Sequence, residues 1–130
     1  MQFWRWHVHL LFSVQHKACA DGSYMKEYTL DEPLTAGFFA YLKYFGRVEM
    51  LAALGEGYYS FSKPGWFSIK GFAGDTSVEV RFTRETMDIT TDFLRMLFLT
   101  YHEGVEKAEI DALKAKEKIR EGQIRKITGK

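Results

Sequence analysis

The sequence has little of what would assign the chain to a disulfide-bonded, membrane-spanning or strongly charged class. Its 130 residues include a single cysteine, Cys19, which has no partner for an internal disulfide and therefore favours a cytoplasmic protein. The most apolar helical segment, residues 93–101, contains Arg95 and is far shorter than the roughly 20 residues that span a bilayer. The net charge is +1, so no overall field would attract nucleic acid or a membrane.

Glycine-rich loops of the kind that bind phosphate are also missing. The glycine-containing segments 55–57 and 71–74 lack the spacing of such loops and the strand-to-helix context in which they occur. The sequence therefore indicates no nucleotide cofactor, and it indicates no other cofactor.

Large aromatic residues are abundant instead. They make up 16% of the chain, with eleven phenylalanines, and this content predicts a core of bulky rings. A chain of this length fits one domain whose hydrophobic core holds it folded without disulfides or metals. We expect an α+β core over residues 1–104 and a C-terminal helical extension over 105–130 with a basic, frayed end.

The N-terminal segment around residues 3–15 has the period of a β-strand. One face is apolar, and the other is polar except at Leu11. The apolar face holds Trp4, Trp6, Val8, Leu10, Phe12 and Val14, whereas Arg5, His7, His9, Ser13 and Gln15 lie on the polar face. We expect this strand to organise the core.

The rest of the chain predicts an antiparallel sheet with helices packed on it. A return strand over about 24–29 precedes a helix near 32–45. A capping-box spacing predicts that this helix begins near Asp31 or Glu32. Three short runs at 58–62, 66–72 and 77–83, separated by turn residues, predict a meander. Residues 47–54 fit either a helix or a strand, with a slight preference for a strand. The pattern ends with two helices. The first would be capped by Thr90 or Thr91 and interrupted near Gly104, and the second is the long C-terminal helix.

The histidine pair on the polar face of the first strand is a candidate site. Arg5, His7 and His9 would point the same way and could bind a small anionic ligand if another element covered them. A metal is a second interpretation, with His102 as the third ligand beside His7 and His9, and Glu103 as a further completion. The alternative is that these side chains form the solvated face of an amphipathic strand.

Two further surfaces suggest partners. The helix at 93–101 is apolar nearly all round and must be covered, either within the chain or by a second copy. A seam of small residues follows at helical spacing, so the expected interface of a homo-oligomer comprises Phe93, Met96, Leu97, Ala108, Ala112 and Ala115. Residues 114–130 hold seven basic residues against two acidic ones, a net charge of +5, which allows binding of nucleic acid or an acidic partner. A solvated helix is the simpler explanation of that tail.

The sequence therefore favours a non-enzymatic domain that associates with itself. A small-ligand-binding or metal-dependent enzyme domain using Arg5, His7 and His9 is the first alternative. Binding through the basic tail is the second. No membrane association is expected.

Overall fold

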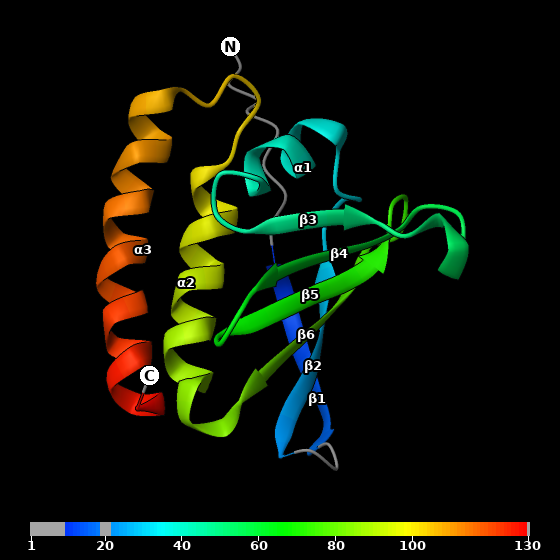
Figure 1. Ribbon diagram of the computed structural model, residues 1–130. Coiled ribbons are helices and arrows are strands. Elements are labelled where there is room, and N and C mark those ends of the chain that lie inside the picture. The colour runs from blue at the N-terminus through cyan, green and yellow to red at the C-terminus, as the bar shows by residue number, and fades with distance from the viewer. Residues whose placement is uncertain (1–9, 19–21, 130) are drawn as a thin grey trace.

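The computed structural model describes residues 10–18 and 22–129 (Figure 1). Within this part of the chain, six strands form one antiparallel sheet in the order β1-β2-β6-β5-β4-β3. The strands are β1 (Leu10–Ala18), β2 (Ser23–Leu30), β3 (Arg47–Met50), β4 (Tyr58–Lys63), β5 (Phe67–Phe72) and β6 (Ser77–Thr83). The helices are α1 (Ala36–Leu42), α2 (Met87–Thr100) and α3 (Lys107–Thr128), with two short 3-10 turns, η1 (Ala52–Leu54) and η2 (Arg84–Thr86).

The predicted α+β fold is confirmed. The helices α2 and α3 run side by side along one side of the sheet, and α1 lies at the end where α2 finishes (Figure 1). The meander of β4, β5 and β6 has the predicted hairpins, and the long C-terminal helix is present. Among the described helices, none is both long and apolar enough to cross a membrane.

The core is built of large rings, as the phenylalanine content predicts. Alternate residues of β4, β5 and β6 face the helices, and α2 inserts fully buried residues such as Phe93 and Leu97 against them. The ring of Phe93 lies 4.9 Å from that of Trp66, whose indole Nε1 donates to the Thr90 hydroxyl at 2.8 Å. The side chain of Phe38 joins α1 to this core, 4.8 Å from the ring of Phe98.

Several element boundaries differ from the sequence prediction. The helix α1 begins at Ala36 and not near residue 32, because the Thr35 hydroxyl caps it by accepting from the Phe38 amide at 3.1 Å. The helix α2 begins at Met87, so Thr90 and Thr91 lie inside it and do not cap it. Residues 47–54 divide into the strand β3 and the turn η1. Gly104, at a φ of 86°, separates α2 from α3 as a true loop.

Buried tyrosines predict a loss of stability in alkaline solution. Burial raises the pKa of Tyr41 and Tyr59, and the negative charges of Glu109 and Asp75 respectively add to the effect. A raised phenol pKa means that the folded state holds its proton more tightly. The stabilisation is therefore complete below the unfolded pKa of about 10 and declines as the pH rises above it. We expect the urea midpoint to fall above about pH 10, and to fall less steeply in a Tyr59→Phe variant. The exposed-site variant Tyr44→Phe should follow the wild type, and a parallel decline in all three proteins would contradict this assignment.

Candidate functional site

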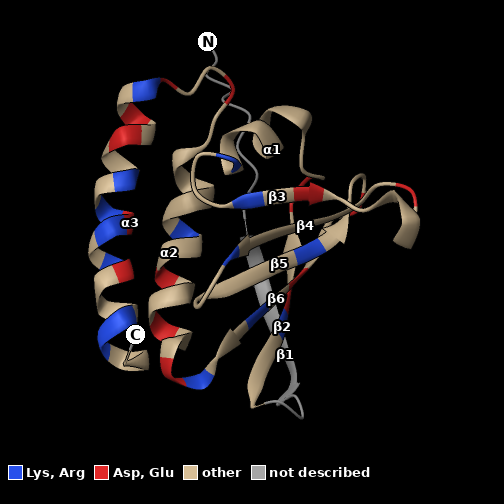
Figure 2. Ribbon diagram, in the orientation of Figure 1, with Lys and Arg blue, Asp and Glu red and all other residues tan. Residues whose placement is uncertain are grey.

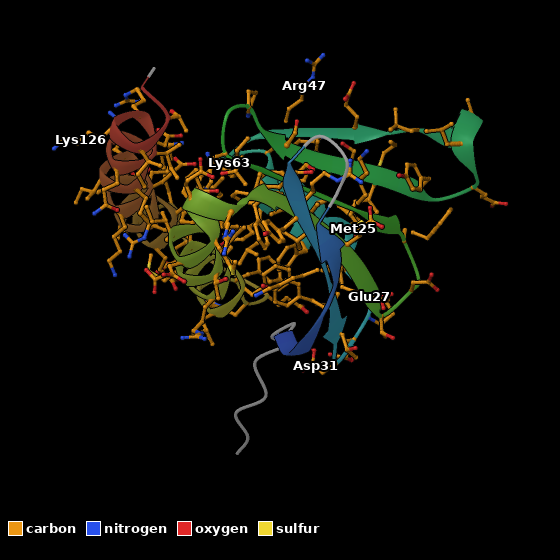
Figure 3. The ribbon with its side chains drawn as sticks, turned by 90° about the horizontal axis from the view of Figure 1, so that it is seen from below. Met25, Glu27, Asp31, Arg47, Lys63 and Lys126 are labelled. Atoms are coloured by element: carbon orange, nitrogen blue, oxygen red, sulfur yellow. The ribbon has the colours of Figure 1, made fainter. Side chains whose placement is uncertain are left out.

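A buried lysine stands at the end of β4, where the sheet meets the helices. The side chain of Lys63 continues the core face that Tyr59 and Phe61 form on β4, and it is 6% exposed. Its ammonium donates to the Phe45 carbonyl at 2.6 Å, to Glu117 Oε2 at 2.5 Å and to Glu121 Oε2 at 3.1 Å. Three acceptors thus satisfy its three protons. Figure 3 shows Lys63 between the helix layer and the strands.

The main partner of this lysine lies on the buried face of α3. Glu117 is 4% exposed and follows Ile110 and Leu113 along the stripe that packs on the rest of the molecule, with Ile124 two turns further on. A second lysine, Lys114, approaches Glu117 Oε1 at 3.4 Å. The network therefore gives each buried charge two partners of opposite sign, as a low-dielectric setting requires.

Aromatic rings lie close to both lysine ammoniums. The Lys63 nitrogen lies 5.3 Å from the ring centre of Trp66 and 5.8 Å from that of Phe93. Lys114 lies 5.4 Å from the ring of Phe45 and donates to the Tyr44 carbonyl at 2.6 Å. The contacts are cation–π interactions, which gain strength when water is excluded. Together they tie α3 to the loop that follows α1 and to the end of β4.

A groove of about 400 Å³ opens beside Lys63. Apolar side chains and cations share its wall, with the cations Arg47 and Arg125 exposed and Glu121 half-buried at 38% side-chain exposure. The lining residues are Phe45, Gly46, Arg47, Ser62, Lys63, Pro64, Gly65, Trp66, Glu121, Ile124, Arg125 and Thr128. Three cations and one carboxylate among them make this an electropositive hollow with an aromatic wall.

The histidine site predicted on the first strand involves residues that the structure does not describe. Arg5, His7 and His9 lie outside the described residues, as does Cys19. The imidazole of His102, in the loop after α2, has its Nε2 2.8 Å from Glu109 Oε2 in the first turn of α3, while Glu103 is exposed. Within residues 22–129, no cluster of three or more His, Cys, Asp or Glu side chains is arranged to hold a metal.

The residues predicted for a homo-oligomer interface lie in different environments. Phe93 and Leu97 are fully buried inside the chain, and Met96 is partly buried, so α2 is covered by the sheet, α1 and α3. The predicted small-residue seam is exposed at Ala108, Ala112 and Ala115. It is therefore not the packed face of α3, which carries Ile110, Leu113, Glu117 and Ile124. The larger apolar side chains bury more area than alanines and decide the orientation of the helix.

The basic tail belongs to α3. Figure 2 shows its lysines and arginines interleaved with acidic residues along the helix. Two of these cations have partners on other elements, because Arg120 donates to Asp92 on α2 and Lys114 reaches the Tyr44 carbonyl. Lys116, Lys118 and Lys126 are exposed. Nucleic-acid binding through this tail stays a prediction.

Sequence reasoning missed both members of the buried pair. Lys63 occupies a core-facing position of a period-two strand, and Glu117 falls four residues after Leu113 and seven before Ile124. One basic and one acidic residue at core positions of different elements are the signal for a buried pair. The sequence interpretation of α3 as a solvated helix treated Glu117 as a surface residue.

Comparison with protein-family models, with curated proteins and with solved structures gives no match for this chain.

Proposed function

We propose that this protein is a binding domain for a small anionic ligand that carries an apolar or aromatic group, held in the Lys63 groove. The observation that supports the proposal is a buried ammonium beside an open groove, with one of its three hydrogen bonds held by a half-exposed carboxylate. Glu121 is that carboxylate, at 3.1 Å. It occupies the position that a ligand anion would take.

Exchange of Glu121 for a ligand anion is chemically balanced. A carboxylate or phosphate oxygen bound to Lys63 would keep the ammonium compensated, while the Glu121 side chain would turn into water, where its charge is solvated. Glu117, which is 4% exposed, would stay in place as the permanent counterion. Arg125 and Arg47 at the rim would attract the incoming anion and favour it over a neutral molecule.

The apolar part of the ligand follows from the other wall. Trp66, Phe45 and Ile124 line the groove, and a volume of about 400 Å³ lies within the range of about 300–1,000 Å³ that small-molecule sites occupy. Rings stack on aromatic walls with a gain of about 0.5–1.5 kcal/mol beyond the area buried. The ligand class is therefore an aromatic or branched aliphatic carboxylate or phosphate.

Calorimetric titration with three probes tests this proposal. Phenyl phosphate combines charge and ring, inorganic phosphate has the charge alone, and benzyl alcohol has the ring alone. We expect phenyl phosphate to bind most tightly. A Glu121→Gln variant should bind it about fivefold more tightly, because the internal competitor loses its charge. An Arg125→Gln variant should bind it about fivefold more weakly.

Lys126→Gln is the matched control, because it removes one positive charge from the same helix at an exposed residue outside the groove lining. Its affinity should equal that of the wild type. Equal affinities in all four proteins, or no heat with any probe at about 1 mM, would refute binding in this groove.

A further inference from the structure

Within the part of the chain that the structure describes, the strand β3 leaves a free edge of the sheet. It is the last strand in the sheet order, and among the described strands it pairs with β4 alone. The amide of Leu51 donates to the Tyr58 carbonyl at 2.8 Å, which fixes the alternation of the antiparallel ladder. The backbone groups of Arg47 and Glu49 therefore face β4, whereas those of Val48 and Met50 face away from it. An outward donor and acceptor on each of these two residues can pair with another strand.

The charges on this edge are complementary to themselves. Arg47 and Glu49 lie on the same face of β3 with side chains 74% and 46% exposed, and Figure 3 shows Arg47 at the outer margin of the sheet. If a second copy pairs antiparallel about Val48, Arg47 of each copy lies directly opposite Glu49 of the other. Both ion pairs form on one face of the joined sheet, and opposite charges in this position stabilise a ladder.

Exposed apolar side chains flank the same edge. Tyr44 is 54% exposed just before β3, Met50 is 55% exposed at its end, and Leu54 is 66% exposed in η1. Figure 1 shows β3 running away from α2 and α3. Antiparallel pairing about Val48 brings Tyr44 of one copy toward Met50 and Leu54 of the other. The edge therefore has apolar contacts to gain at both ends of this short ladder.

We infer that two copies of this chain associate through β3, by antiparallel pairing centred on Val48, into a continuous two-fold sheet. Each interface residue meets its counterpart across the two-fold axis, as in other isologous dimers. Because the ladder is short, the dimer is weak, and the fraction of dimer depends on the protein concentration. This interface is different from the α2 and α3 surface that the sequence suggests. It shares Arg47 with the rim of the Lys63 groove, but it needs no ligand there.

A charge exchange measured by sedimentation equilibrium tests the inference. The single variants Arg47→Glu and Glu49→Arg each place like charges opposite one another at both pairs, so the dimer dissociation constant should rise at least about tenfold. The double variant should dimerise like the wild type, because each pair is restored in reverse. An equimolar mixture of the two single variants should form heterodimers, because every opposing pair in that combination joins opposite charges.

Heterodimer formation in the mixture would show that both single variants are still folded. A variant that had lost its fold would not regain association when the other variant is added. Met50→Ser should also weaken association, while Leu99→Ser, which removes an apolar side chain of similar exposure from α2, should not. A wild-type monomer at about 1 mM, or single variants that associate as the wild type does, would overturn the inference.

Discussion

Replacing Lys63 with methionine is expected to lower the free energy of unfolding by about 3–5 kcal/mol. The substitution keeps an unbranched side chain of similar length but removes the charge. Glu117, 4% exposed, would then lose its buried ammonium partner and keep only the more distant Lys114, at 3.4 Å, and the Phe45 carbonyl would lose a donor. Urea denaturation followed by tryptophan fluorescence, to which the core residue Trp66 contributes at 5% exposure, measures the change.

The partner substitution separates the charge from the packing. In the double variant Lys63→Met with Glu117→Leu no buried charge is left without its partner, so most of the lost stability should return. Lys126→Met, at an exposed position of α3, should change stability by less than about 0.5 kcal/mol. If the double variant were no more stable than Lys63→Met alone, the buried pair would not be the source of the loss.

Recovery in the double variant would also bear on the role of the pair. Well-packed apolar residues often stabilise a core as well as a buried ion pair does, so stability alone gives little reason for a lysine at this position. Binding of an anion gives a reason for the lysine. Only a cation beside the groove can release the Glu121 carboxylate and bind a ligand anion in its place. The stable double variant should then bind phenyl phosphate at least about tenfold more weakly than the wild type.

The sheet was predictable because its strands are short, amphipathic and separated by strong turn residues. Val78, Val80 and Phe82 alternate with polar residues on β6, and a two-residue period admits one assignment of faces. The Lys63-Pro64-Gly65 turn forms as expected, with the Trp66 amide bonded to the Lys63 carbonyl. Helix starts were less predictable, because Thr35, Thr90 and Thr91 are all suitable caps by residue type, and of these three only Thr35 caps a helix.

The orientation of α3 and the candidate site were not predictable from local patterns. Two stripes at helical spacing run along α3, one of alanines with Ile119 and one of Ile110, Leu113 and Ile124 with Glu117 among them. In the sequence, a glutamate within the second stripe argues against burial of that stripe, as long as the lysine that pairs with the glutamate is unknown. That lysine lies 54 residues away in the sequence, so the fold is needed to bring the pair together. The Arg5, His7 and His9 site stays a prediction.

The same leucine-to-alanine substitution at two positions of α2 should have very different effects. Leu97 is fully buried, so Leu97→Ala should cost about 2–5 kcal/mol through lost burial and the cavity that remains. Leu99 lies two residues further on and is 56% exposed, so Leu99→Ala should cost less than about 1 kcal/mol. Urea denaturation gives both values, and sedimentation of the folded proteins checks the interface role that the sequence suggests for Leu97. If Leu97→Ala left stability unchanged but abolished self-association, α2 would be a subunit interface, and neither its packing inside the chain nor the β3 dimer would stand.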